Sequence, residues 1–184
     1  MRYRVIFVLL AVMAQFCLVP AEAGKSDDKK AKRLIKDLKK SRVASERSEA
    51  AWDLGELGVV AAVPALTEAL RDSSAAVRAN AATSLGKLGD AAKTALPALR
   101  ELLNDSSGSV VASAAWSLVK HGVAKTELIP AYRRVLEDKS CRVRLRGVRG
   151  LLGQVPPQEL FPVALACSRD PDLETKMEAG DLLR

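Results

Sequence analysis

Residues 63–74 read VPALTEALRDSS, and residues 96–107 read LPALRELLNDSS. The two blocks lie 33 positions apart, and fainter copies begin at Ile129 and Phe161. After each of the first two blocks comes an alanine-rich segment that closes on a glycine. Self-similarity at this period is typical of helical repeats that stack on one another. The repeat therefore predicts the shape of the molecule, and no catalytic signature accompanies it.

Each repeat is predicted to form two helices. The proline of each block suits the first turn of a helix, where its missing N–H costs nothing. Leucines four residues apart, such as Leu66 and Leu70, form the buried side of this helix. Hydroxyl groups of the Asp-Ser-Ser turn are expected to cap the second helix, and a left-handed glycine (Gly58, Gly89 or Gly122) ends it. Because one pair cannot bury its apolar face alone, the pairs must stack, and they are expected at 32–57, 62–88, 93–121, 124–154 and 157–184.

The composition fits one domain of closely packed helices. The chain has 184 residues, of which 48% are hydrophobic and only 4% aromatic, so alanine and leucine must fill the core. Its formal net charge is +7. A basic surface attracts acidic proteins, nucleic acids and anionic membranes, but it does not indicate a reaction.

Residues 1–23 are typical of an export signal. Arg2 and Arg4 provide the positive start, residues 5–19 are almost wholly apolar, and residues 21–23 read AEA, a small-x-small cleavage site. The apolar run is shorter than the ~20 residues of a spanning helix, although retention as an uncleaved anchor stays open. We therefore predict a periplasmic or secreted protein, with no transmembrane helix after cleavage.

The rest of the chain divides into a short tail and the repeats. Residues 24–31 are dense in charge and are predicted to form a solvated basic tail, and residues 32–184 form the repeat domain. At the start of that domain, Leu34, Ile35 and Leu38 are spaced to share one side of a helix.

The quoted blocks, together with the segment VRANAATSLGKLG at residues 77–89, resemble HEAT repeats, in particular the short bacterial HEAT-like repeats first noted in phycobilisome lyases. The resemblance implies an all-α, right-handed α-solenoid of about five helix pairs. In this family the aspartate of the turn and the arginine after the valine often form a ladder that ties neighbouring repeats together. Val111 replaces the arginine in the third pair, so the ladder is expected to break there. The positions that match the ladder are Asp72, Asp105, Asp138, Arg78 and Arg144.

HEAT-like repeats serve mostly as protein-binding scaffolds, and the resemblance implies the same role here. Relatives similar to deoxyhypusine hydroxylase hold iron with paired His-Glu motifs, but His121 is the sole histidine and Gly122 follows it. We therefore predict no enzymatic activity, no metal and no cofactor. His121, in the last turn of a helix, is interpreted as a cation near the negative end of the helix dipole. Asp170, Asp172 and Glu174 have the spacing of a calcium loop but lack its glycine, and are interpreted as acids of a helix's first turn.

Cys141 and Cys167 are the cysteines that remain after signal cleavage, in a compartment that permits disulfides. They are predicted to lie at the same end of adjacent layers, so a bridge is conceivable. Adjacent layers stand ~10 Å apart, however, and a disulfide needs Cα atoms within ~7 Å. Two separate thiols are therefore expected.

Trp52 and Trp116 occupy equivalent positions in their repeats, each after a pair of alanines. Large aromatic side chains usually bury area, so the two are predicted to pack between neighbouring repeats. A second interpretation stays open, in which they form an aromatic pair on the concave surface that anchors a peptide or carbohydrate.

The strongest candidate for a binding site is a basic cluster in the fourth pair. Arg142, Arg146 and Arg149 share one helical face, where like charges are destabilising unless carboxylates or a ligand offset them. Two interpretations are balanced: a solvated face neutralised by Glu137 and Asp138, or a site for an acidic partner. The cluster consists of Arg133, Arg134, Lys139, Arg142, Arg144, Arg146 and Arg149.

Together these features predict a scaffold that binds another, acidic protein through the concave surface of the second helices, with this cluster and Trp116 contributing. One alternative is an anionic ligand held by the same arginines: a lipid headgroup, a glycan or, less suited to an exported protein, nucleic acid. A second alternative is an accessory subunit of an enzyme complex. The last pair lacks a polar capping repeat, so Met177, Leu182 or Leu183 is expected to face a partner or a second copy.

Overall fold

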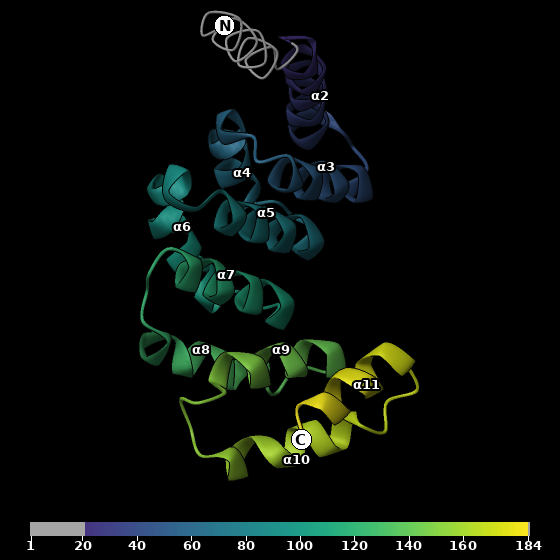
Figure 1. Cartoon of the computed structure of the whole chain (residues 1–184), viewed down its shortest axis with the longest axis vertical. Coiled ribbons are helices and arrows are strands. Elements are labelled where there is room, and N and C mark those ends of the chain that lie inside the picture. Colours follow the sequence, from purple (N-terminus) through teal and green to yellow (C-terminus); the bar gives the residue numbers. More distant parts are fainter. Residues whose placement is uncertain (1–20, 184) are drawn as a thin grey trace, which may run out of the picture.

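The chain folds into a stack of helix pairs (Figure 1), which a computed structural model describes over residues 21–183. Within that range no residue lies in a strand, and the predicted all-α solenoid is confirmed. Short 3-10 helices precede or follow the first helices of several pairs: η1 (Val60–Ala62), η2 (Gly89–Ala95), η3 (Leu102–Asn104) and η4 (Lys125–Leu128). The pairs are α2 (Ala21–Lys40) with α3 (Ala44–Glu56), α4 (Val63–Ala69) with α5 (Ala75–Leu88), α6 (Leu96–Glu101) with α7 (Gly108–Lys120), α8 (Ile129–Val135) with α9 (Cys141–Leu151), and α10 (Pro157–Cys167) with α11 (Leu173–Asp181).

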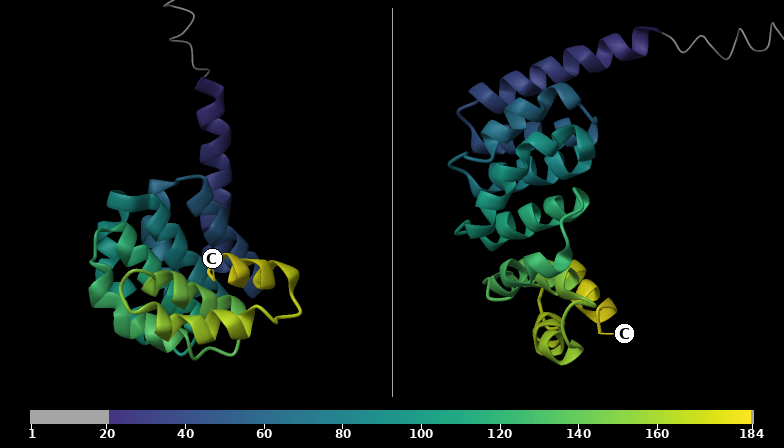
Figure 2. Two further views of the ribbon diagram at one scale, coloured as in Figure 1. Left: turned by 60° about the horizontal axis from the view of Figure 1, so that its bottom comes forward. Right: turned by 90° about the vertical axis from the view of Figure 1, so that its left-hand side faces the viewer.

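The N-terminal helix is longer than the sequence predicts. Residues 24–31, predicted as a solvated tail, belong to α2, whose first turns extend beyond the stack (Figure 2). Lysine and alanine favour a helix here, and Lys32 Nζ lies 2.7 Å from Asp28 Oδ2 one turn earlier. The second half of α2 packs onto the repeats, with Leu38 buried and the other two residues of its predicted apolar stripe partly buried.

The predicted export signal, residues 1–23, lies outside the described residues except for its last three positions, which belong to α2. Export and cleavage therefore stay predictions. In the part of the chain that the structure describes, no helix is both long enough and apolar enough to cross a bilayer.

Leucine and alanine fill a continuous core that runs through all five pairs. Leu66, Leu85 and Leu99 are fully buried in it and come from three successive helices. Buried alanines between the second helices allow their backbones to approach closely. At one such crossing, the buried Ser84 hydroxyl of α5 donates a hydrogen bond of 2.7 Å to the Ala51 carbonyl of α3, so it ties two layers together.

The Asp-Ser-Ser turns are built differently from the prediction. Their serine hydroxyls make no capping hydrogen bond to α5, α7 or α9. Instead, an aspartate oxygen accepts a hydrogen bond of 2.8–2.9 Å from the backbone N–H two residues later, as aspartate does in an Asx turn. The glycines that follow the helices have the predicted positive φ, 64° at Gly58, 54° at Gly89 and 86° at Gly122. Aspartate thus shapes the turn and keeps its other oxygen available to a neighbouring repeat.

Candidate binding groove

A groove of about 540 Å³ runs along the second helices of the first four pairs. Its walls come from α3, α5, α7 and α9, and side chains of α8 and η4 contribute at one end. The second helices follow one another along the stack (Figure 1), so residues far apart in the sequence meet there. The lining includes Trp52, Thr83, Trp116, Tyr132, Arg146 and Arg149, and so collects most of the predicted binding residues.

A larger hollow of about 700 Å³ lies among α2, α4 and α6. Its charged groups are already paired with one another: Lys39 Nζ lies 2.8 Å from Glu68 Oε2, and Arg47 Nε lies 2.7 Å from Asp72 Oδ2. The groove of the second helices is therefore the better candidate for a binding site.

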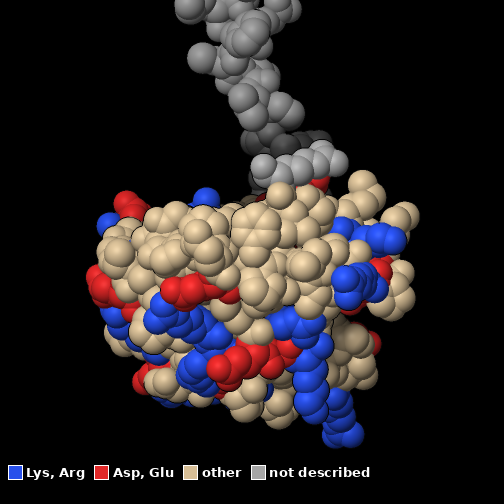
Figure 3. Space-filling view, turned by 90° about the horizontal axis from the view of Figure 1, so that it is seen from below, with Lys and Arg blue, Asp and Glu red and all other residues tan. Residues whose placement is uncertain are grey.

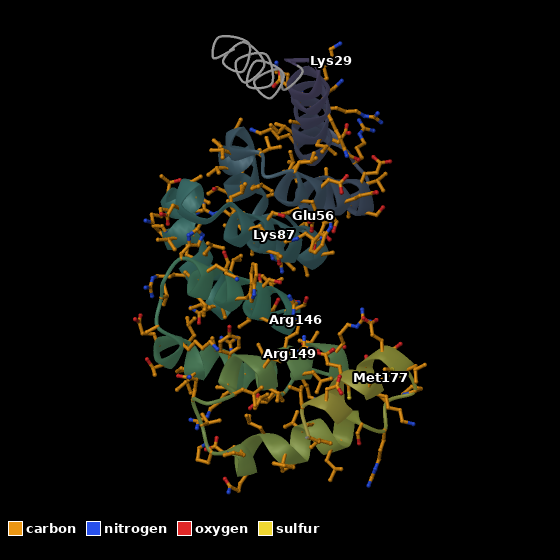
Figure 4. The ribbon with its side chains drawn as sticks, in the orientation of Figure 1. Lys29, Glu56, Lys87, Arg146, Arg149 and Met177 are labelled. Atoms are coloured by element: carbon orange, nitrogen blue, oxygen red, sulfur yellow. The ribbon has the colours of Figure 1, made fainter. Side chains whose placement is uncertain are left out.

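The two tryptophans contribute to the groove in different ways. Trp52 is 41% exposed, and Lys87 Nζ lies 3.5 Å from the centroid of its ring. That ammonium group also pairs with Glu56 (Figure 4). The half-buried Trp116 packs onto α5 where Gly86 leaves room, since a Cβ there would lie 2.7 Å from the ring. Each tryptophan contacts α5 of a neighbouring repeat and also lines the groove, while its role as an anchor for a ligand stays a prediction.

Tyr132 and Gly150 shape the end of the groove at α9. The buried Tyr132 ring of α8 lies against Gly150, where a Cβ would come within 2.3 Å of it. Burial raises the pKa of the Tyr132 hydroxyl, against the opposing effect of the nearby Arg146 charge. Sequence reasoning missed that the Tyr132 ring fills the space beside Gly150.

Three of the seven members of the basic cluster are paired with carboxylates within the described structure, but not with the predicted acids. Among the described residues, Glu137 and Asp138 form no ion pair with the cluster, so that prediction is wrong. The acids come from the fifth pair, because α10 and α11 pack beside α9. Seen from the C-terminal end, basic and acidic side chains lie interleaved (Figure 3). The ion pairs are Arg133 with Glu159 at 2.9 Å, Arg142 with Asp172 at 3.8 Å and with Glu174, and Arg149 with Glu178 at 3.2 Å.

Two further arginines of the cluster bind the backbone. Arg134 donates hydrogen bonds to the carbonyls of Leu103 at 2.9 Å and Asp105 at 3.3 Å. Arg144 donates to the carbonyl of Asp138 at 2.8 Å. Arg134 therefore joins the third and fourth pairs, instead of standing ready for a ligand as predicted.

Arg146 differs from the rest of the cluster. It is half-buried on the side of α9 toward α7 (Figure 4), and burial lowers the pKa of its guanidinium against the attraction of Glu178. Within the described residues its sole hydrogen-bond partner is Ser113 Oγ, at 3.2 Å from Nη2, and no carboxylate forms an ion pair with it. A partly desolvated cation therefore faces the groove with N–H donors unused.

The ladder between repeats exists at its first two steps. Arg47 binds Asp72 through two hydrogen bonds of 2.7 and 2.8 Å, and Arg78 binds Asp105 through two of 2.8 and 2.9 Å. Sequence reasoning missed Arg47, which lies 31 rather than 33 positions before Arg78. Hydrogen bonding from Arg47 lowers the pKa of Asp72; at Asp105 burial acts in the opposite direction, but hydrogen bonds from Arg78 and the Ser107 N–H outweigh it.

The ladder stops at the third step. Val111 is buried in a small apolar cluster, and among the described residues the side-chain carboxylate of Asp138 forms no ion pair with an arginine. The fourth step departs from the prediction, because Arg144 forms no ion pair within residues 21–183 and its Nη2 lies 2.7 Å from Cys141 Sγ. The ladder therefore joins the first three helix pairs, and other contacts join the fourth and fifth.

Cys141 and Cys167 lie close together as free thiols. The Cys167 Sγ is 3.8 Å from the Cys141 carbonyl oxygen, and both residues pack in one cluster with Leu145. The spacing of the layers therefore does not separate the two residues as expected. Burial, together with hydrogen bonding to Cys167 and Asp170, raises the pKa of Cys141 to about 12.

His121 is the C-cap residue of α7, at the helix end where the sequence places it. Both ring nitrogens are buried and lack a hydrogen-bond partner within the described part, so they do not bind the terminal carbonyls of α7. Asp172 accepts a hydrogen bond of 3.0 Å from the Thr175 N–H at the start of α11, which fits its interpretation as a first-turn acid. Among the described residues, no group of three or more His, Cys, Asp or Glu side chains could hold a metal ion.

The C-terminal pair leaves apolar side chains uncovered. Met177 is 63% exposed, as expected, and Leu173 and Phe161 are 68% and 51% exposed. Leu182 is instead partly buried and packs against the core.

The fold and the groove define an α-solenoid of helix pairs. Residues 31–119 match the family model for HEAT repeats, so this part of the chain consists of HEAT repeats, as the sequence predicts. No curated protein matches the chain.

Solved structures resemble the chain over most of its length. The complex of CpcE and CpcF of phycocyanin lyase from Nostoc sp. PCC7120 is 27% identical over 83% of this chain, with a TM-score of 0.50. The match covers 63% of that lyase chain, so our chain spans less than two thirds of its length. An engineered protein (20% identity, 83% and 79% of the two chains, TM-score 0.48) is also similar. So is a designed armadillo repeat protein in complex with the peptide (KR)4 (19% identity, 82% and 79%, TM-score 0.45).

Proposed function

We propose that this protein is a non-enzymatic scaffold of the cell envelope or the secreted fraction, which holds a segment of another protein in the groove of its second helices. The observation that carries the proposal is the groove itself, where Trp52, Trp116 and Arg146 come together from three different repeats. Large aromatic and arginine side chains are the residues on which binding energy concentrates in protein interfaces. The envelope location rests on the signal pattern of residues 1–23.

A second candidate is an accessory subunit of an enzyme complex. The similar lyase structure is a complex of two named chains, CpcE and CpcF, which supports a role in which this solenoid acts beside a partner. Both candidates use the same groove, and they differ in whether the partner is itself an enzyme.

The anionic-ligand alternative has less support. Its proposed arginines are largely held by acids of the fifth pair, and these carboxylates would repel a polyanion. Polyanion binding would weaken steeply and log-linearly with salt. Binding of a protein segment should instead survive salt and be lost in Trp116→Ala.

Photocrosslinking in the producing cell tests the proposal. A photoreactive amino acid at Thr83, inside the groove, should give a discrete adduct with another protein. The same amino acid at Glu101, an exposed position on α6 outside the groove, is the matched control and should give none. Equal adducts at both positions, or none at Thr83, would count against the groove as the binding surface.

A further inference from the structure

The charges at the α9 end of the groove do not balance. Arg146 and Arg149 both line it, and Glu178 is the carboxylate that acts on both. Arg149 Nη1 holds Glu178 at 3.2 Å, so Arg146 feels this acid only from a distance. Arg146 and Arg149 thus share one carboxylate, and no carboxylate is among the described residues that line the groove, so this end of the groove carries a net positive charge.

This cation is poorly compensated for its degree of burial. Arg146 uses a single N–H on Ser113 Oγ, whereas the other arginines of the cluster have carboxylates or backbone carbonyls as partners. A buried charge is unfavourable unless it is paired and hydrogen-bonded. A carboxylate that entered the groove would accept the unused donors in a fork geometry that suits guanidinium groups.

The surroundings favour a peptide rather than a polyanion. Trp116 and Val119 line the same groove as Arg146 and offer apolar surface, while Glu178 would oppose a run of negative charges. The groove also continues past this point toward Trp52, so it suits an extended chain that passes through.

We propose that the groove recognises a glutamate or aspartate side chain in an extended segment of the partner protein, which pairs with Arg146 while an adjacent apolar side chain packs on Trp116. This inference rests on the proposed function and names the chemistry that the partner must present.

Selection from a phage library of random linear peptides on the immobilised protein provides the probe. One enriched peptide is then synthesised, and its affinity is measured by fluorescence anisotropy in the original form and with Glu→Gln or Asp→Asn. We expect enriched peptides to place an acid beside an apolar residue, and removal of that charge to weaken binding about tenfold.

A double-mutant cycle identifies the arginine. The Arg146→Gln variant should bind the acidic peptide about tenfold more weakly than the natural protein does. Both proteins should bind the amide form of the peptide with the same affinity, because removing either charge removes the same interaction. Arg142→Gln is the control on the same helix, since Arg142 pairs with Asp172 and Glu174, and should change nothing. The peptide substitution leaves the protein untouched, so it remains informative even if an arginine variant folds poorly.

The outcomes separate this inference from the proposed function. Thr83→Trp in the protein places a large side chain in the groove. If it abolishes binding while Glu→Gln in the peptide has no effect, the proposed carboxylate recognition is wrong, but the groove is still the peptide-binding surface. If amidation of the peptide's C-terminus abolishes binding, Arg146 recognises the terminal carboxylate. That result would overturn the proposal that it recognises a glutamate or aspartate side chain. If no peptide is enriched, or Thr83→Trp has no effect, both proposals fail.

Discussion

Arg78 of α5 donates two hydrogen bonds to Asp105 of the next repeat, from Nε to Oδ2 at 2.8 Å and from Nη2 to Oδ1 at 2.9 Å. Asp105 also accepts the Ser107 N–H at 2.8 Å, so one carboxylate shapes a turn and joins two layers. Both side chains are largely shielded from water. Charge-assisted pairs in such positions are stronger than those on open surfaces.

Asp105→Ala should lower the free energy of unfolding by about 2–3 kcal/mol, because it removes the bonds from Arg78 and Ser107 and leaves the guanidinium without its partner. Urea denaturation followed by circular dichroism measures the change. Asp138→Ala is the matched control, since the Asp138 carboxylate accepts the turn bond from the Ser140 N–H but pairs with no arginine side chain among the described residues. It should cost about 1 kcal/mol. Equal losses would mean that the ladder adds nothing to stability.

Acid should weaken the same contact. The pKa values of Asp72 and Asp105 are lowered in the folded chain, so their contribution is complete above the pKa of the unfolded carboxyl and is lost as pH falls through that value toward the folded pKa. We expect the stability difference between the natural protein and Asp105→Asn to be largest near pH 7 and to shrink below pH ~4. Denaturant titrations at several pH values measure it. A difference that stays constant into acid would contradict the role of the ionised carboxylate.

His121→Leu should stabilise the protein by about 1–2 kcal/mol. Both ring nitrogens are buried without a hydrogen-bond partner in the described structure, and an apolar side chain of similar size removes that unfavourable burial. Thermal unfolding provides the comparison. His121→Asn keeps a polar group at the position and should give no gain. A destabilised leucine variant would show that the imidazole makes a favourable interaction here.

The thiol of Cys141 should react slowly. With its pKa raised to about 12, little thiolate exists at pH 8. We expect iodoacetamide to modify Cys141 at least about a hundredfold more slowly in the folded protein than in urea, as read by mass spectrometry of the peptide. The denatured but unreduced protein should titrate both Cys141 and Cys167. If neither reacts, the pair is joined in a disulfide.

Sequence reasoning reached furthest where a local rule repeats. The period, the prolines and the terminal glycines placed the helices of pairs two to five within a few residues of their observed bounds. It failed at the Asp-Ser-Ser turns, where two side chains could accept a backbone hydrogen bond. There the aspartate oxygen accepts the bond from the backbone N–H, and the serine hydroxyl does not. It also failed at α2, where helix-favouring residues extend a helix through the predicted tail.

At the binding site, too, the sequence predicted some features and missed others. Equivalent positions placed Trp52 and Trp116 on the same row, but nothing local indicated that Glu174 and Glu178 would neutralise Arg142 and Arg149. The cluster of acids at Asp172, Glu174 and Glu178 in the last pair was the available signal. It could be used only with the knowledge that α11 packs beside α9.

By itself, the amino-acid sequence determined that this chain is a stack of paired helices with a broad surface, because the apolar period and the turn residues act within a few positions of one another. Only the tertiary structure decided which charges on that surface are satisfied. Ion pairs form between side chains that are 25–32 positions apart along the chain, and their partners depend on how the layers stack. Arg146 is left without a carboxylate because Arg149 is the arginine that reaches Glu178.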